Sequence, residues 1–413
     1  MRLLLSAYAC EPDTGSEPGV GWNWAVELAA LGHEVWVLTR ANNRQRIERA
    51  LETLDSVLRP NFLYFDLPRW VAWWKRGGRG VQVYYYLWQI GALRVARRAH
   101  EELRFDAVQH LTFGVFRQPS LMGRLGIPFV LGPVGGGERT PPRLRGVYSR
   151  RERLWEWLRD AANRVMVHDP LVADTYRRAT TVLAKTPDTL AVLPAAARGR
   201  ARCFLEVGLP SATIAGSPSA WTGGTFRLLY VGRFINLKGI ALGIRALARL
   251  RENGVAVTLS LVGSGPRLQA WQEMARALGV CDRLDWMGWK AQHELPAIYR
   301  AHHALLFPSL HDSSGNAVLE GMAQGLPVIC LDVGGPSAVA GVDASMVVAT
   351  AGRSEQEVVA ALADAVSGLM ASPRLHAAKS AAALERARGM TWRDVVGRLW
   401  QPATLPERVR DHA

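Results

Sequence analysis

Four charged residues in the second half of the sequence have the types and spacing needed to bind a phosphorylated ligand. Arg233 and Lys238 lie five positions apart directly after an apolar run, and Asp312 and Glu320 lie eight apart after another. An arginine fork and a lysine point charge can hold one pyrophosphate together. The two acids flank a predicted turn, which contains Gly315 and leads into a helix N-terminus, an arrangement that favours anions. The pattern predicts a phosphate site.

Lysine is rare in this chain, so its placement carries information. Only five of the 50 basic residues are lysine: Lys75, Lys185, Lys238, Lys290 and Lys379. A lysine beside Gly239, just beyond a predicted strand, indicates a phosphate-binding role, with a plain surface pair as the alternative.

Two other turns in this half have composition suited to ligands but are weak signals by themselves. Gly263 and Gly265 form a tight glycine turn between a predicted strand and a helix, which is common in α/β proteins. Gly288 and Trp289 follow another strand, where an indole could lie against a flat base.

The elements that must position these residues alternate between strand and helix in both halves of the chain. The first half predicts strands at residues 3–8, 35–39, 62–65, 107–110 and 129–132, and helices at 22–31, 44–54 and 87–103. The second half predicts strands at residues 227–231, 256–262, 284–287, 304–307, 327–331 and 345–348, and helices at 240–253, 266–278 and from 316 to before 325. Such alternation is typical of parallel sheets with helices on both faces.

We therefore predict an α/β fold of two doubly wound, Rossmann-like domains that face each other across a cleft. The first domain is expected at residues 1–208, a linker rich in Gly, Pro and Ser at 209–224, and the second domain at 225–390. Residues 391–413 predict a helix that crosses back to the first domain. Ligands in such folds bind at the carboxyl ends of the strands.

Composition excludes several classes of protein. With 49% hydrophobic and 21% charged residues, the 413-residue chain has ample core and is not disordered. No apolar run reaches the ~20 residues of a spanning helix. The first ten residues predict a core strand and not a signal peptide. The four cysteines lack the spacing of a disulfide framework or zinc site, so a cytoplasmic location is expected.

The order and spacing of these motifs resemble those of retaining nucleotide-sugar glycosyltransferases of the GT-B fold, glycosyltransferase family 4 (glycosyl transferases group 1). The quoted residues are Gly-Arg-x4-Lys-Gly at 232–239, Asp312 and Glu320 in place of the family's Glu-x7-Glu, and Gly-Leu-Pro-Val at 325–328. The resemblance implies that Arg233 and Lys238 hold the donor diphosphate and that Glu320 accepts hydrogen bonds from the ribose. It further assigns the following residues to the donor: Gly232, Gly263, Gly265, Gly288, Trp289, Ser313, Gly315, Asn316, Ala317 and Val318.

Asp312 departs from the family pattern. The family has glutamate there, and this chain has an acid one methylene shorter, followed by Ser313 and Ser314. Because the resemblance implies that this acid contacts the transferred sugar, the departure affects the expected sugar more than the expected reaction.

The first half contributes a glycine-rich turn and a histidine. Residues 15–24 occupy the first strand-to-helix turn, where the resemblance implies that Gly19 and Gly21 close over the donor phosphate. Glu17 is expected either to face the acceptor or to cap the helix. His110 is expected at a strand end and is assigned to catalysis. The acceptor side is assigned to Glu17, Trp22, Gly135, Gly136 and Glu138.

The predicted activity is transfer of a sugar, with retention, from a UDP-, GDP- or ADP-linked donor to a glycan, lipid-linked or small-molecule acceptor, in polysaccharide or cell-envelope glycan synthesis. No cofactor or metal is expected. A GT-B epimerase or phosphorylase is one alternative, and a non-enzymatic anion-binding or nucleic-acid-binding protein is another. The net charge of +14 motivates the last, but no nucleic-acid-binding motif accompanies it, so no nucleic-acid partner is expected.

The positive charge and the aromatic residues also suggest a membrane partner. Arginines alternate with Trp and Tyr at residues 69–104 and 139–164. Both stretches suit the surface of an anionic membrane, so docking at its inner face through Trp70, Trp73, Trp74 and residues 84–88 is expected. A solvated basic face and ordinary aromatic packing are the alternatives.

Overall fold

The computed structural model describes residues 1–68, 70–71, 73–74 and 80–401, which form two compact units. Unit 1 comprises Met1–Gly137, Leu158–Glu206 and the segment from Trp392. Unit 2 comprises Glu138–Trp157 and Val207–Thr391. The sequence-based boundaries did not foresee that residues 138–157 group with unit 2. Three of the sequence predictions fall partly or wholly outside the described residues. They concern Lys75, some of the basic stretch at residues 69–104, and the part of the predicted C-terminal helix beyond residue 401.

Unit 1 contains a parallel sheet whose strand order is β3-β2-β1-β4-β5-β6-β7. Its strands are β1 (Arg2–Ala7), β2 (Glu34–Thr39), β3 (Asn61–Tyr64), β4 (Ala107–Thr112), β5 (Phe129–Val134), β6 (Thr181–Ala184) and β7 (Ala201–Cys203). The last two were not predicted. Both are short, with four residues in β6 and three in β7, which leaves little alternating pattern to recognise.

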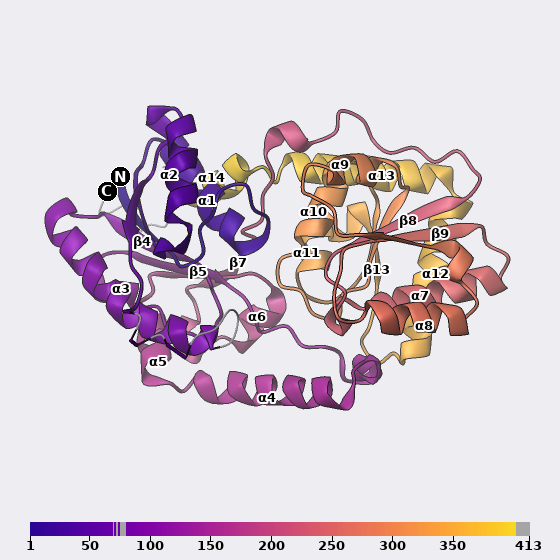
Figure 1. Ribbon diagram of the computed structural model, residues 1–413, viewed down its shortest axis with the longest axis horizontal. Coiled ribbons are helices and arrows are strands. Elements are labelled where there is room, and N and C mark those ends of the chain that lie inside the picture. The colour runs from indigo at the N-terminus through magenta and orange to yellow at the C-terminus, as the bar shows by residue number, and fades with distance from the viewer. Residues whose placement is uncertain (69, 72, 75–79, 402–413) are drawn as a thin grey trace. The chain divides into compact units, whose positions relative to one another are not determined.

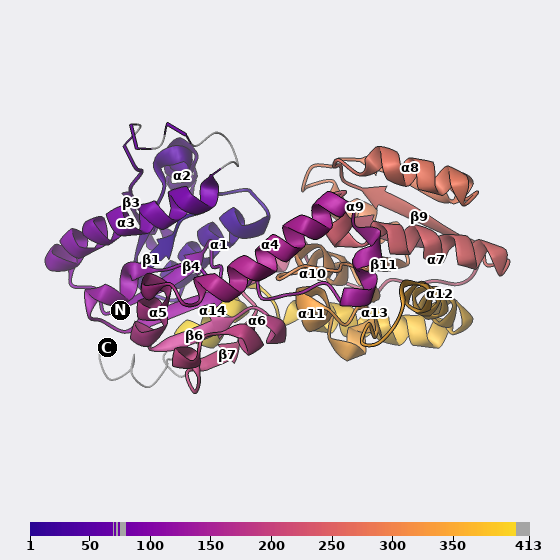
Figure 2. The ribbon, with the colours of Figure 1, turned by 90° about the horizontal axis from the view of Figure 1, so that it is seen from below.

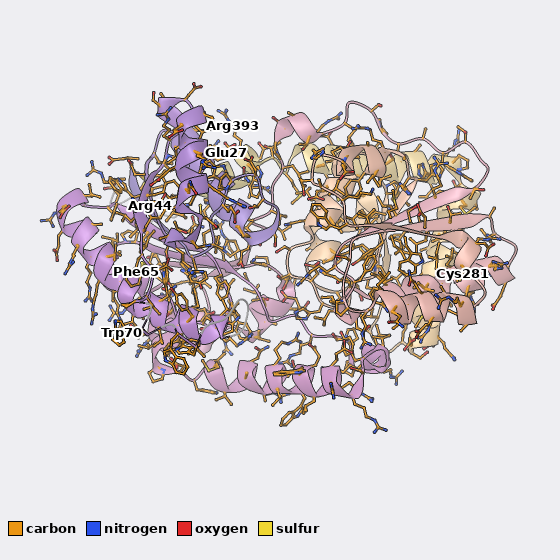
Figure 3. All side chains as sticks on the ribbon, in the orientation of Figure 1. Glu27, Arg44, Phe65, Trp70, Cys281 and Arg393 are labelled. Atoms are coloured by element: carbon orange, nitrogen blue, oxygen red, sulfur yellow. The ribbon has the colours of Figure 1, made fainter. Side chains whose placement is uncertain are left out.

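Helices cover both faces of this sheet. They are α1 (Ser16–Ala30), α2 (Arg44–Thr53), α3 (Val81–Leu103), α5 (Pro170–Arg178), α6 (Pro187–Val192) and α14 (Trp392–Trp400), and α4 (Arg150–Met166) has residues in both units. Buried side chains of α1 and α14 form one core with the sheet, and those of α3 form the other. Glu27 of α1 and Arg393 of α14 lie near each other, and Phe65 lies against α3 (Figure 3). Figure 2 views the molecule from the side of α3 and α5.

Unit 2 contains a second parallel sheet, with the order β10-β9-β8-β11-β12-β13. Its strands are β8 (Phe226–Val231), β9 (Val257–Val262), β10 (Leu284–Gly288), β11 (Ala304–Phe307), β12 (Val328–Leu331) and β13 (Ser345–Val348). All six were predicted within a few residues. β11 and β12 are buried at every position, which explains why they read as continuous apolar runs.

The helices of unit 2 also lie on both faces of their sheet. They are α7 (Ile240–Glu252), α8 (Leu268–Ala277), α9 (Leu295–Arg300), α10 (Asn316–Ala323), α11 (Gly334–Ala344), α12 (Glu355–Ala371) and α13 (Pro373–Arg388). Figure 1 shows α7 and α8 on one side of the sheet and α9 and α13 on the other. The α/β, two-domain prediction is confirmed.

The predicted linker is attached to unit 2 by hydrogen bonds. The N–H of Ala215 donates to the carbonyl of Ala323 in α10 (2.7 Å), and the N–H of Ser219 donates to Oγ of Ser380 in α13 (2.7 Å). The segment rich in Gly and Ser is therefore irregular in structure and packs on α10 and α13 of unit 2.

None of the helices in the described part of the chain is, taken singly, long and apolar enough to cross a membrane. α12 and α13, which meet at an angle of 103°, satisfy the length and composition criterion only as a bent pair.

Candidate functional site

The turns after β8 and β11 lie where the strand order of the unit 2 sheet reverses, which is the usual ligand position in such sheets. The two turns are in contact, because the N–H of Leu310 donates to the carbonyl of Leu237 (2.9 Å). Gly239 has a φ of 65°, and a Cβ there would lie 1.9 Å from the carbonyl oxygen of Pro308. Gly239 therefore allows this close contact.

Lys238 and Asp312 form an ion pair between these two turns. Nζ of Lys238 donates to Oδ2 of Asp312, and the two side chains are only 14% and 15% exposed. Burial alone would raise the pKa of Asp312, but the lysine and two backbone N–H groups outweigh it, so this pKa lies below its ordinary value. Asp312 is thus ionised at neutral pH. The structure brings together two of the residues predicted for catalysis.

Asp312 also organises its own loop. Its Oδ1 accepts from the N–H groups of Ser314 (3.1 Å) and Gly315 (3.3 Å), an Asx-type turn that suits the short side chain. Its carbonyl accepts from the N–H of Gly335 (2.8 Å), and a Cβ on Gly334 would lie 2.3 Å from that oxygen. Sequence reasoning missed Gly334 and Gly335, although the Gly-Gly-Pro sequence after a strand was a usable signal.

The first turn of α10 has two backbone donors open to a ligand. Gly315 precedes the helix with a φ of 78°, and the N–H of Val318 donates to the carbonyl of Gly315 (3.0 Å). Within the described part of the chain, the structure records no hydrogen bond from the N–H groups of Asn316 and Ala317. Of the amides predicted to approach the donor, these two are the ones that the protein leaves available. Ser313 adjoins them in the same loop.

Glu320, on α10, is held by two residues that sequence reasoning missed. Its Oε1 accepts from the Gln292 amide (3.1 Å), and its Oε2 accepts from the hydroxyl of the buried Tyr299 (3.0 Å). Burial raises the pKa of Glu320, and these hydrogen bonds only partly offset the effect. Each oxygen retains a lone pair that could accept from a ligand hydroxyl. No sequence motif identifies Gln292 or Tyr299 as partners, because the pairing depends on the fold.

The glycines after β8 and β9 let these two turns pack on each other. Gly263 has a φ of 135°, and a Cβ there would lie 2.0 Å from the carbonyl oxygen of Gly232. A Cβ on Gly265 would lie 2.5 Å from the carbonyl oxygen of Phe234. Arg233 lies between Gly232 and Phe234 in the chain. Its side chain is exposed and takes part in no ion pair recorded among the described residues. Its guanidinium is available to a ligand.

The turn after β10 exposes a large aromatic ring. Trp289 is 73% exposed, and the preceding Gly288 has a φ of 69°. Three residues further on, Gln292 bonds to Glu320, so this turn adjoins the acid. An exposed indole offers a flat face on which a base can stack.

Glu152, in the first turn of α4, was not predicted as a site residue but is bonded to two of these turns. Its carboxylate accepts from the Nδ2 of Asn236 (2.8 Å), two residues before Lys238, and forms an ion pair with Arg267, beyond the Gly263–Gly265 turn. It also forms a capping box with Ser149. Hydrogen bonds from these partners lower its pKa against the opposing effect of burial.

In unit 1 the structure corrects the placement of His110. This residue lies inside β4 and is 2% exposed, with Nε2 2.9 Å from the hydroxyl of Tyr85. Burial lowers its pKa to about 4, so the ring is neutral at pH 7. The predicted strand ended at His110, whereas β4 continues to Thr112, so the strand end lies two residues further on. Its catalytic role stays a prediction.

Glu17 holds the turn that follows β4. Its Oε1 accepts from the N–H of Phe113 (2.7 Å), a residue with a φ of 59°. Glu17 lies in the first turn of α1, where a carboxylate favours the helix dipole, and the capping alternative stays a prediction. The acceptor contact stays a prediction.

The predicted glycine-rich loop is largely helical. Helix α1 begins at Ser16, so Gly19 and Gly21 lie within it. A Cβ on Gly19 would lie 2.0 Å from the carbonyl oxygen of Thr14, and one on Gly21 would lie 2.3 Å from that of Ala9. The close approach that was expected toward a phosphate is made toward the protein's own backbone.

The acceptor-side residues are mostly buried. Trp22 is 8% exposed and stacks on Phe62, with ring centroids 6.3 Å apart, so it is a core residue. The N–H of Gly135 donates to the carbonyl of Gly114 (2.8 Å), and the carbonyl of Gly136 accepts from Asn163 (3.3 Å). Glu138 is buried and groups with unit 2, where a Cβ on Gly334 would lie 3.4 Å from its Cγ.

Residues 225–372, which include the turns after β8, β9, β10 and β11, match the family model described as Glycosyl transferases group 1. Over 96% of both chains, the structure is similar to sucrose-phosphate synthase from Thermosynechococcus elongatus, with a TM-score of 0.63 and 17% identity. The chain has the GT-B glycosyltransferase fold. Anabaena HepE in complex with UDP shares this GT-B architecture, with a TM-score of 0.60 and 15% identity over 96% of this chain and 98% of that one.

Curated relatives match shorter parts of this GT-B chain. The 2-deoxystreptamine glucosyltransferase of Streptomyces kanamyceticus is 34% identical over 106 residues, which are 26% of this chain and 27% of the relative. The D-inositol 3-phosphate glycosyltransferase of Mycobacteroides abscessus is 35% identical over 165 residues, 40% of this chain and 35% of the relative. The matches thus span about a quarter to a third of these two relatives' lengths.

Proposed function

We propose that this protein transfers a glycosyl group from a nucleotide diphosphate sugar to an acceptor hydroxyl, with retention at the anomeric carbon. The observation that carries the proposal is the Lys238–Asp312 pair at the reversal point of the unit 2 sheet, beside the exposed Arg233. The matched family and the glycosyltransferase relatives support the reaction class. The UDP named in the HepE complex supports a UDP-linked donor.

Different residues of unit 2 bind the diphosphate, the ribose and the base of the donor. Arg233 and Lys238 hold the diphosphate together with the open N–H groups of Asn316 and Ala317. Glu320 accepts from the ribose hydroxyls, positioned by Gln292 and Tyr299, and Trp289 stacks on the base. Asp312 keeps Lys238 in place and shapes the loop next to the sugar, which makes it the residue that tunes sugar specificity.

Transfer breaks the bond between the anomeric carbon and the diphosphate oxygen, and the electron pair goes to that oxygen. The acceptor oxygen bonds to the same face of the sugar, and its proton passes to the departing diphosphate. Arg233 and Lys238 stabilise the charge that develops on the leaving group. In this proposal the two cations take the part that a divalent metal plays elsewhere, and no cofactor is needed.

The acceptor class proposed is a glycan or a lipid-linked sugar in the synthesis of a polysaccharide or cell-envelope glycan. A lipid-linked acceptor would suit a cytoplasmic protein that docks on the inner face of a membrane.

Nucleotide binding and a charge-removing variant together test the proposal. UDP, GDP and ADP are screened by thermal shift, and sugar transfer is then measured with the matching donor. Because Arg233 is exposed, we expect Arg233→Ala to leave the melting temperature unchanged and to lower kcat by about 10²-fold or more. Arg249→Ala, at the end of α7, is the matched control. Normal turnover by Arg233→Ala, or no nucleotide binding by the wild type, would contradict the donor site.

A further inference from the structure

Helix α4 has its apolar side turned toward solvent. Its exposed fractions are 57% for Leu154, 71% for Trp155, 59% for Trp157, 41% for Leu158 and 68% for Val165. Large apolar side chains gathered on one exposed helix mark an interaction surface.

The polar side of the same helix is buried. Glu156, Asp160 and Asn163 are 7%, 6% and 4% exposed. The amide of Asn163 accepts from Arg117 (2.7 Å) and donates to the carbonyl of Gly136 (3.3 Å). The amphipathic pattern is therefore inverted relative to an ordinary surface helix, which buries its apolar side.

The spacing of the exposed residues places them on one continuous face. Leu154, Leu158 and Val165 follow an i, i+4, i+11 pattern, so they lie along one line of the helix. Trp155 and Trp157 lie on opposite sides of that line. We call the five residues together the α4 apolar face. Figure 1 shows α4 as one continuous helix.

The charge around the α4 apolar face has a single sign. Arg150, Arg151, Arg153 and Arg164 are exposed, whereas none of the acids of α4 is exposed. Arg150 and Arg151 lie in the first turn, where positive charge opposes the helix dipole. Helix stability therefore does not account for them, and an anionic partner would.

We propose that α4 docks on the surface of an anionic lipid membrane, with the α4 apolar face among the acyl chains and headgroups and the surrounding arginines on lipid phosphates. Exposed Trp and Leu bordered by arginine are the composition of helices that lie in a membrane interface. A second copy of the chain fits less well, because two such faces would bring arginine against arginine. The inference is independent of the proposed donor site.

Vesicle flotation tests the proposal on the full-length protein. The vesicles are neutral phosphatidylcholine alone or phosphatidylcholine with about 30% phosphatidylglycerol. We expect the wild type to float with the anionic vesicles at about 0.1 M salt and to be released at about 0.5 M. The double variant Trp155→Ser/Trp157→Ser should bind about tenfold more weakly, and so should Arg150→Glu/Arg151→Glu.

Two controls keep the experiment decisive. Val342→Ser, at a residue of unit 2 that is 73% exposed, should float like the wild type. Trp70→Ser/Trp73→Ser tests the other exposed aromatic residues, which are 79% and 77% exposed (Trp70 is labelled in Figure 3). A wild type that ignores anionic vesicles, α4 variants that bind normally, or binding lost only in the Trp70/Trp73 variant would overturn the proposal. So would self-association, measured by sedimentation, that the α4 variants abolish.

Discussion

The six strands of the unit 2 sheet have the same order as the first six strands of the unit 1 sheet, but the contacts between the turns at the reversal of strand order differ. In unit 1 the turns after β1 and β4 are held by side chains that accept hydrogen bonds from backbone N–H groups. The N–H of Ala9 donates to Thr112 Oγ1 (2.9 Å), and the N–H of Phe113 donates to the carboxylate of Glu17. In unit 2 the corresponding turns are joined by the Lys238–Asp312 ion pair. The side chains at this position thus accept from backbone N–H groups in unit 1, whereas in unit 2 two of them form an ion pair.

A position at the reversal of strand order does not by itself make a ligand site. Both reversals satisfy the topological rule for α/β sheets. Among the described residues, the unit 2 reversal adds an ion pair whose side chains are only 14% and 15% exposed, beside open backbone N–H groups. In unit 1 the side chains of Thr112 and Glu17 at the reversal accept hydrogen bonds from backbone N–H groups.

The largest effect is expected from removing one member of the charged pair. Lys238→Met leaves the Asp312 carboxylate without its cation, which should lower the free energy of unfolding by about 3–5 kcal/mol and abolish transfer. Adding Asp312→Asn should restore most of the stability but not the transfer. Denaturant unfolding measures the first effect and a transfer assay the second. Lys379→Met serves as control, and equal instability of the single and double variants would rule out the ion pair as the cause.

A smaller, pH-dependent effect is expected at His110 in unit 1. Its pKa is about 4 in the folded protein and 6.5 ordinarily, so the unfolded chain binds the proton first. Stability should therefore be lost as pH falls from about 6.5 to about 4, by up to about 3 kcal/mol from this residue.

His110→Gln should flatten this part of the stability profile, measured as melting temperature against pH, and leave the pH dependence of kcat unchanged in shape. Abolished transfer with unchanged stability would instead support the predicted catalytic role of His110 and contradict the contrast between the two units.

The smallest effect is expected from Glu17. Glu17→Gln keeps the size of the side chain but replaces a charged acceptor of the Phe113 N–H with a neutral one, which should cost about 1 kcal/mol of unfolding free energy. The turnover should not change, and chemical denaturation with a parallel assay measures both. A large fall in turnover at constant stability would instead favour the acceptor-contact interpretation.

The sequence was most informative where chemistry and periodicity agreed. The apolar runs of β8, β11 and β12 and the charged residues that follow them predicted the unit 2 sheet and its turns. Lys238 was identifiable because lysine is so rare in this chain. Gln292, Tyr299 and Glu152 could not be identified, since each becomes a partner only through contacts between residues 28, 21 and 84 or more positions apart in the chain.

The surroundings of the glycines and of His110 in unit 1 could not be predicted from the sequence, for a physical reason. A glycine in a sequence indicates that another group packs close to its Cα, but it does not identify that group. At Gly19 and Gly21 the neighbouring groups are the backbone carbonyls of Thr14 and Ala9. A histidine near the end of a strand can be inside or beyond it, and one residue of difference turns the side chain to the other face of the sheet. His110 lies within β4 and is buried.

The hydrogen bonds of Glu152 couple α4 to the turn that carries Lys238. This one carboxylate belongs to the first turn of α4 and holds Asn236, which directly precedes Leu237 and Lys238. A ligand that changes the geometry of Lys238 and a surface that changes the position of α4 would therefore act on the same hydrogen bond. Any factor by which the surface strengthened nucleotide binding would equal the factor by which the nucleotide strengthened attachment to the surface.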